Sequence, residues 1–499
     1  MSNCILQATT APRIGRTIDE LLASGGRMQM AYAWFPESGA PAELRYIATV
    51  RGQRAFAVWH MKSDAANVPS MAGKSPLLGW YEREMMEMSG VEFSGHPQPE
   101  RLVTAHMAQT AQPPLVPVAD AHVHEHATSR TLAMPSLPQV SGKHVQLLPF
   151  GPVRADVVES AQFIFYYIGE GILHYHPNLF LKHRGMEKQF ESTDPMAGVL
   201  TAERVSGVGS VAHALAFSQA VEDAAGCEVP ERARWIRVIV AELERVYNHL
   251  HYLGHLCHTT TLKVGEAEGK LLEERAKQMN ARATGSRFLR NVICPGGARR
   301  DIDMLAIAEG LDGMRSEIDR YIGLIERTTS HIDRLISTAP LSQQLAFDQG
   351  ASGPVERASG VDRDLRRDHP YAAYDVLQPV VATHAQGDAF ARMKVRIAEL
   401  RASIQLLDAA VMHGMDGGLL VAPYTLPPHS EGLGWSESPR GTVLYALHFD
   451  VNGRIARAKI KSASFSNWNA FQFTVNDSNM MDYAINEASF GLTIAGCAR

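Results

Sequence analysis

The cysteines are the residues whose type could hold a soft metal ion, but their spacing argues against that role. There are five, scattered along the chain at Cys4, Cys227, Cys257, Cys294 and Cys497. No two are separated by two residues, whereas thiolate metal sites are usually built from such pairs. We therefore expect free thiols in a reducing compartment rather than a disulfide framework or a cysteine metal site.

Three alternate histidines, His122, His124 and His126, form a second candidate metal site. On a strand they would face the same side and could together grip a metal ion. They fall within residues 106–145, a polar stretch with several prolines that is typical of an extended connector. Exposed histidines without a metal are therefore the simpler interpretation, and metal analysis distinguishes the two.

The elements that must position such residues divide the chain into two blocks around that connector. Residues 1–105 combine short strand-like runs with a helical pattern near residues 75–89, which predicts a small α+β domain. Residues 146–499 begin with strand-like segments and continue mainly as helices, so the fold class is α+β overall. Helical spacing of apolar residues predicts helices over residues 207–226, 230–258, 264–291, 304–338 and 386–413. Residues 440–475 alternate more like strands, with a turn at Gly453.

Composition and charge exclude several classes of function. The net charge of −5 gives no reason to expect nucleic-acid binding. No run of about 20 apolar residues is present to span a bilayer, and residues 1–6 lack the pattern of a secretory signal. No Gly-x-Gly-x-x-Gly motif follows a strand and opens a helix, so we expect no NAD site. Any link to a membrane is therefore expected to run through partner proteins.

Six short motifs occur in an order that resembles the landmarks of one family. They lie at residues 151–159, 183–188, 230–250, 294–301, 357–374 and 438–468. They resemble the large subunit of group 4 membrane-bound nickel–iron hydrogenases, of the energy-converting and formate hydrogenlyase type, and its complex I homologue. Residues 80–97 resemble the small peripheral-arm subunit of complex I. The resemblance implies an α+β N-terminal domain followed by a mainly helical, hydrogenase-large-subunit-like domain with β flanks.

In the hydrogenase members of that family, four cysteines hold nickel and iron. The resemblance places these four ligand positions at Ser206, Gly209, Thr493 and Gly496. Moving the second pair by one residue places it at Ile494 and Cys497 instead, so one thiol remains at most. A serine hydroxyl is a poor substitute for a thiolate, because its pKa is far above 7. We therefore expect no nickel–iron catalysis and no cofactor bound by this chain, with an iron–sulfur cluster in a partner subunit.

The complex I members of the family use the same cavity for a quinone headgroup, bound by a histidine and a tyrosine. The matching positions here are Val158 and Gly207. Neither side chain can donate the hydrogen bond that the headgroup needs. Ordinary quinone reduction is therefore not expected, unless another donor takes over.

Four polar residues remain at positions to which the resemblance gives a role. Glu159 matches a glutamate thought to relay protons, and the alternative is a salt-bridged structural glutamate. Arg184 and His249 lie in segments that would face the iron–sulfur cluster of the partner, and Arg204, which remains from the motif of the first cysteine pair, is a further cofactor-binding candidate. The alternatives are an ordinary polar interface for Arg184 and, for His249 and also His213, a histidine satisfied in the core.

The leading hypothesis is a subunit of a membrane-associated, hydrogenase-like or NADH:quinone oxidoreductase-like complex, on the cytoplasmic face of the cell membrane. It would form the cavity beside the cluster of an iron–sulfur small subunit and dock on antiporter-like membrane subunits. The alternative is a non-catalytic scaffold that couples its partners to ion or solute movement. Whether the chain is an enzyme stays open, and hydrogenase activity of its own is not expected.

Overall fold

The structure is a computed structural model that describes residues 3–37, 39–63, 68–105, 113–117, 140, 142–154, 159–413, 417–421 and 424–499. Most of the predicted connector at 106–145 lies outside these residues, and with it His122, His124 and His126. Val158 lies outside them too. Among the described residues, no helix has both the length and the apolar character that a bilayer crossing needs. The predicted α+β class is confirmed.

The N-terminal unit is a four-stranded sheet with two helices packed against it. The strand order is β1 (Cys4–Ala8), β4 (Phe56–Lys62), β3 (Glu43–Thr49) and β2 (Arg27–Trp34), with β1 parallel to β4 and the other pairs antiparallel. The helices are α1 (Ala11–Ala23) and α2 (Leu77–Ser89). Buried Ile14, Ile18 and Leu21 follow helical spacing, so α1 presents an apolar stripe to the core. A short parallel pair, β5 (Val68–Pro69) and β6 (Phe93–Ser94), completes the unit.

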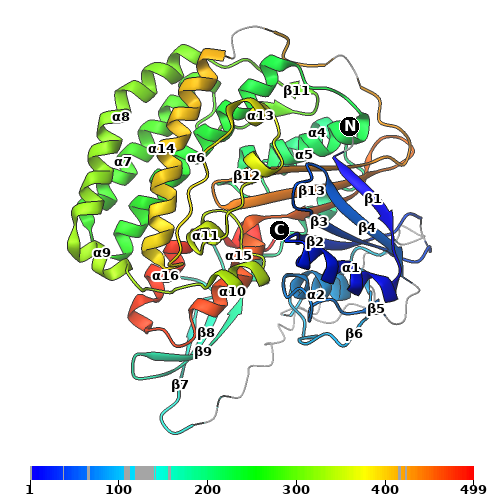
Figure 1. The fold of residues 1–499 in the computed structure, drawn as a ribbon, viewed down its shortest axis with the longest axis horizontal. Helices are drawn as coiled ribbons and strands as arrows, with labels where there is room; N and C mark the ends of the chain where they lie inside the picture. Colours follow the sequence, from blue (N-terminus) through cyan, green and yellow to red (C-terminus); the bar gives the residue numbers. More distant parts are fainter. Residues whose placement is uncertain are drawn as a thin grey trace.

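A second sheet projects from the body of the molecule (Figure 1). Its antiparallel strands are β7 (Gln146–Phe150), β8 (Gln162–Ile168) and β9 (Gly171–Asn178). Phe163, Phe165 and Tyr175 of this sheet gather around the ring of Tyr483, with ring centroids 4.8 to 6.0 Å apart. These aromatic contacts fix the base of the sheet against the C-terminal helices. Three short helices follow, η1 (Phe180–Lys182), α3 (Met186–Gln189) and α4 (Pro195–Ala202).

Long helices form the side of the molecule opposite the N-terminal unit (Figure 1). They are α6 (Glu231–Thr259), α7 (Lys263–Thr284), α8 (Met304–Arg327) and α14 (Ala389–His413), with the short α9 (Thr329–Leu335) after α8. Helix α5 (Ser210–Ala225) packs instead against β12 (Glu431–Ser438). Helix α6 packs against both α7 and α14 and is buried along most of its length. At the crossing of α6 and α7, a Cβ atom on Gly269 would lie 2.7 Å from the Cα atom of Gly254. Glycine is therefore required where these two backbones meet.

Two of the predicted helices are longer than those in the structure. The helix predicted over 264–291 ends at Thr284, because Gly285 adopts the left-handed conformation, φ 75°. The helix predicted over 304–338 is divided by Thr328, which is extended between α8 and α9. The remaining short elements are β10 (Ile293–Cys294), β11 (Gly297–Ala298), α10 (Gln343–Asp348), α11 (Pro354–Ala358), α12 (Leu365–Asp368) and α13 (Tyr374–Leu377).

A third antiparallel sheet lies between α5 and the N-terminal unit (Figure 1). Its strands are β12 (Glu431–Ser438), β13 (Gly441–Phe449) and β14 (Ile455–Lys461), and the predicted turn at Gly453 joins the last two. Beyond residue 461 the strand prediction is wrong, because the Ser462 hydroxyl caps a helix by accepting the amide N–H of Phe465. The C-terminal helices are α15 (Ala463–Phe471), α16 (Tyr483–Phe490) and α17 (Ile494–Cys497).

One hydrophobic core runs through the N-terminal unit and the rest of the molecule. Buried ion pairs cross the same boundary, with Arg27 2.6 Å from Glu356 and Lys459 2.7 Å from Glu84. Arg499 also pairs with Glu84, at 2.9 Å. The N-terminal unit therefore helps to hold the C-terminal segment in place.

Candidate functional site

Two segments that are far apart in the sequence meet at a small cavity near the end of β12. The first, residues 204–210, leads into α5, and the second, residues 491–497, includes α17. The cavity has a volume of about 20 Å³, enough for one water molecule. Its lining comes from these segments and from the neighbouring strands and helices: Ser206, Val208, Gly209, His213, Ser438, Arg440, Val443, Ser462, Ala463, Ser464 and Gly496.

The structure brings the four ligand positions together. Ser206, Gly209 and Gly496 line the cavity, and the Thr493 hydroxyl lies 3.2 Å from the hydroxyl of Ser464, which also lines it. Two of these positions carry a hydroxyl group, and the two glycines carry no side chain. They do not fit a binuclear centre that needs four thiolates. Cys497 is buried, and its thiol is not part of the lining. Across the described residues, no group of three histidine, cysteine, aspartate or glutamate side chains is placed to hold a metal ion.

Hydroxyl groups near the cavity are used to hold the backbone. The Thr493 hydroxyl accepts the amide N–H of Gly496 at 3.1 Å and so caps α17. The Ser464 hydroxyl accepts the amide N–H of Thr493 at 3.2 Å, and the Ser462 hydroxyl donates to the carbonyl of Gly496. The segment that would carry the second pair of thiolates is therefore fixed by side-chain-to-backbone hydrogen bonds.

Arg184 joins the two segments that carry the ligand positions. Its guanidinium donates to the carbonyl oxygens of Arg204, at 3.0 Å, and Val205, at 2.5 Å, just before Ser206. It also donates to the carbonyl oxygen of Ala495, at 3.0 Å. Arg184 is half-buried, and this burial lowers its pKa. The arginine thus acts as a clamp, and its predicted place facing a partner cluster stays a prediction.

Glu159 holds the same C-terminal segment from the other side. Its two carboxylate oxygens accept the amide N–H groups of Ile494, at 2.6 Å, and Ala495, at 2.9 Å. A carboxylate at the first amides of α17 satisfies donors that the helix itself cannot pair. This geometry is that of a structural carboxylate held by hydrogen bonds, and proton relay by Glu159 stays a prediction.

The predicted histidines and Arg204 do not converge with Arg184. His249 is buried on α6, where its Nε2 atom lies 3.0 Å from the carboxylate of Glu399, and burial lowers its pKa to about 4. His213 lines the cavity with its Nδ1 atom 2.9 Å from the Tyr445 hydroxyl, and burial lowers its pKa to about 3. Both histidines are therefore neutral at pH 7. Arg204 is exposed and donates to the carbonyl of Leu200.

Arg440 is a residue of the site to which the sequence reasoning gave no role. Its guanidinium lines the cavity and donates to the carbonyl of Gly491, at 2.7 Å, and to Oδ1 of Asn248, at 2.6 Å. Burial lowers its pKa to about 10, so Arg440 keeps its positive charge at pH 7. Its sequence could have indicated this role, because Arg440 belongs to the motif at residues 438–468. The cavity therefore combines one cation with hydroxyl groups.

Comparisons with known proteins place the chain among described families. Three family models match: "Respiratory-chain NADH dehydrogenase, 49 Kd subunit" over residues 271–431, "Nickel-dependent hydrogenase" over 184–285, and "Respiratory-chain NADH dehydrogenase, 30 Kd subunit" over 27–117. The third match covers most of the N-terminal unit. The first two lie in the helical part.

Several curated proteins are similar over most of the chain. Formate hydrogenlyase subunit 5 of Escherichia coli (strain K12) is 29% identical, over 89% of this chain and 79% of its own length. Hydrogenase-4 component G of the same organism is 29% identical, over 84% and 74%. An NADH-quinone oxidoreductase subunit of Citrifermentans bemidjiense is 30% identical, over 68% of this chain and 95% of its own length.

Proposed function

Because the chain belongs to the family of the complex I 49-kDa subunit and the nickel-dependent hydrogenase large subunit, we propose that it is a subunit of a membrane-associated electron-transfer complex. The names of its relatives support this proposal, since they are subunits of formate hydrogenlyase, hydrogenase-4 and NADH-quinone oxidoreductase. In the proposal, the chain shapes a cavity beside the iron–sulfur cluster of a small partner subunit. Antiporter-like partners hold it at the inner face of the cell membrane.

We further propose that this subunit works without a nickel–iron centre and binds no other cofactor itself. The observation that carries this proposal is the cavity in which the four ligand positions meet. Ser206, Gly209 and Gly496 line it, and Thr493 caps a helix beside it. Nickel and iron need thiolates here, and a cavity of about 20 Å³ has room for about one water molecule.

A second candidate function is a non-catalytic scaffold that couples its partners to ion or solute movement. The clamp formed by Arg184 and the contacts of Glu159 favour it, because both residues are used to hold backbone segments together. In this candidate the cavity is a structural remnant. The motif residues then serve to pack the surrounding segments together.

Narrowing the cavity distinguishes an electron-accepting site from a scaffold. A Cβ atom added at Gly209 would lie 3.5 Å from the ring of His213, an ordinary contact, so Gly209→Ala adds a methyl group without forcing the backbone. The complex is purified with its native partners, its iron–sulfur cluster is reduced, and reoxidation is followed by electron paramagnetic resonance. Slower reoxidation in an intact Gly209→Ala complex supports electron transfer that depends on this cavity. An unchanged rate supports the scaffold.

A further inference from the structure

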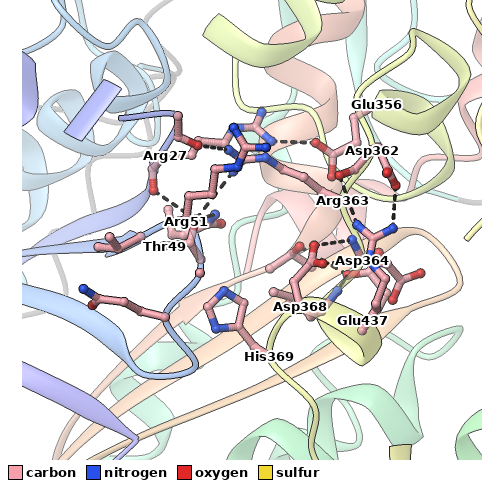
Figure 2. A pocket seen from close by; sticks show the side chains of 18 residues that line it. Arg27, Thr49, Arg51, Glu356, Asp362, Arg363, Asp364, Asp368, His369 and Glu437 are labelled. Carbon is pink, nitrogen blue, oxygen red and sulfur yellow. Dashed lines mark hydrogen bonds and ion pairs between the residues drawn. The ribbon is translucent and has the colours of Figure 1, made fainter. Parts of the chain in front are cut away.

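A larger cleft lies on the opposite face of the β12–β13–β14 sheet from the small cavity. It has a volume of about 490 Å³ and opens between the N-terminal unit and the segment around α11 and α12. Figure 2 shows Arg27, Thr49 and Arg51 on one wall and Asp364, Asp368 and Glu437 on the other. None of the residues that line the small cavity also lines this cleft. The cleft is therefore a separate site.

One layer of sheet separates the two spaces. Glu437 lines the cleft, whereas the next residue of β12, Ser438, lines the small cavity. On β13 the same alternation places Thr442 in the cleft and Val443 in the cavity. Successive side chains of a strand point to opposite faces, so a charge on Glu437 acts across the sheet on the cavity.

Glu437 belongs to a buried ion network with unequal numbers of charges. The network consists of Arg245, Arg357, Arg366, Glu242, Asp364, Glu399 and Glu437. Its side chains are at most 2% exposed. Three guanidinium groups thus face four carboxylates, and His249, which contacts Glu399, is neutral. With all four carboxylates ionised, the network carries one excess negative charge.

Glu437 is the carboxylate of this network that is held least firmly. Asp364 accepts two N–H groups of Arg366, at 2.7 and 3.0 Å. Glu437 accepts one N–H group of Arg357 at 3.0 Å, and its other oxygen has only long contacts with the Leu365 amide and the Thr442 hydroxyl, at 3.5 and 3.4 Å. Glu437 and Asp364 both border the cleft, and Glu437 is the one whose protonation removes the excess charge at the lower cost in hydrogen bonds.

The charged and titratable side chains that surround Glu437 come from several elements of the fold. Charged and titratable groups that face it or the cleft are Arg27, Arg51, Arg245, Glu356, Arg357, Asp362, Arg363, Asp364, Arg367, Asp368, His369, Tyr371 and Lys461. Burial is the largest cause that raises the pKa of Glu437, to about 7, with Asp364 adding to it and Arg357 opposing it. Lys461, whose ammonium donates to Gln29 of the cleft wall at 2.7 Å, has a pKa that burial lowers to about 7. An acid that lines the cleft and a base that is hydrogen-bonded to its wall thus both titrate near neutral pH.

We propose that Glu437 is a proton-exchange site. Its carboxylate takes up one proton from water in the cleft, and the carboxylic acid later returns that proton to the same water. No electron moves, and the charge of the buried ion network changes between −1 and 0. Arginine keeps its proton, so the exchanged proton stays on Glu437 and acts on the cavity through its charge. This inference does not rest on the proposed redox function.

Infrared titration of the purified full-length chain tests the proposal. Protonated carboxyl groups give a C=O stretching band that carboxylates lack. We expect this band to decrease as the pH rises through about 7, and Glu437→Gln to remove one carboxyl from it. Asp362→Asn, at an exposed carboxylate of the same cleft that pairs with Arg367, is the matched control and should remove none.

The infrared signals of two other buried carboxyl groups must be distinguished from that of Glu437. Burial also raises the pKa of Glu82 and Glu244 to about 7. These residues do not line the cleft, so the Glu437 band should shift first when the protein is moved into D₂O. An unchanged band in folded Glu437→Gln overturns the proposal, and so does a Glu437 band that exchanges as slowly as the other two.

A second variant keeps the proposal testable if Glu437→Gln does not fold. Thr442→Val removes a hydroxyl that contacts the Glu437 carboxylate at 3.4 Å and changes the shape of the side chain little. A hydrogen bond to the charged form favours that form, so the substitution should move the titration midpoint to higher pH. A midpoint that stays in place or moves to lower pH contradicts the proposal.

Discussion

The guanidinium of Arg184 lies 3.0 Å from the carbonyl oxygen of Ala495, and through this hydrogen bond two distant segments of the chain meet. The same side chain holds the carbonyls that precede Ser206. The resemblance to nickel–iron hydrogenases places the four predicted metal-ligand positions on these segments. Here arginines join them, since Arg440 also donates to the carbonyl oxygens of Gly491 and Val208.

Loss of the Arg184 clamp should destabilise the protein. Arg184→Gln removes three hydrogen bonds to carbonyl groups, and we expect the free energy of unfolding to fall by about 1–3 kcal/mol. Denaturant unfolding measures the change. Arg204→Gln is the control, because Arg204 is exposed and should change stability by less than about 0.5 kcal/mol. Equal effects of the two substitutions would contradict the clamp.

Neutralising Glu159 should loosen α17. In Glu159→Gln, one amide oxygen replaces the two carboxylate oxygens that accept the N–H groups of Ile494 and Ala495. We expect a loss of about 1 kcal/mol in stability. Amide hydrogen exchange at these two residues should become faster. If their exchange stays as slow as in the wild type, the structural role assigned to Glu159 is wrong.

His249 should make the fold sensitive to acid. Burial lowers its pKa to about 4 from 6.5, so between these pH values the unfolded chain binds a proton that the folded chain does not. The stability that it contributes is present above pH 6.5 and is lost as the pH falls towards 4, on the order of 3 kcal/mol. His249→Gln should flatten this part of the stability–pH curve, measured by denaturant unfolding. The exposed His429→Gln is the control, and equal curves for His249→Gln and wild type would refute the assignment.

The contact between α6 and α7 should not tolerate a side chain at Gly269. A Cβ atom there would lie 2.6 Å from the Tyr321 hydroxyl and 2.7 Å from the Cα atom of Gly254. Gly269→Ala should therefore cost about 1–3 kcal/mol through overpacking. Gly313→Ala lies at an exposed position of α8, where a Cβ atom would make only an ordinary contact, 3.9 Å from the Arg275 guanidinium. It should instead leave stability unchanged or raise it by up to about 1 kcal/mol. Thermal unfolding of both variants provides the comparison.

The long helices were predictable because their apolar residues repeat with helical spacing. Their ends were less predictable, since the left-handed Gly285 and the extended Thr328 depend on local conformation rather than on periodicity. Strand β12 was missed, because its two large apolar residues, Leu433 and Trp435, are flanked by glycine and serine, which are more typical of turns. Helix α15 was predicted as a strand, because the role of Ser462 as its N-terminal cap was not recognised.

That the predicted ligand positions lie near one another could be inferred from the motifs, whereas the use of the surrounding residues could not. Sequence order placed Ser206 and Gly496 in one site, and the structure brings them to one cavity. That Arg184 points to backbone carbonyls depends on tertiary packing, as does the pairing of His249 with Glu399. No spacing in the sequence records such contacts.

Elemental analysis of the complex purified with its native partners tests the central claim most directly, with nickel, iron and zinc measured per complex. The account predicts iron, supplied by the clusters of the partner subunit, and no stoichiometric nickel. Nickel near one atom per complex would contradict it, because the hydroxyl and glycine positions at Ser206, Gly209, Thr493 and Gly496 would then have to hold a metal centre for which they lack the ligands.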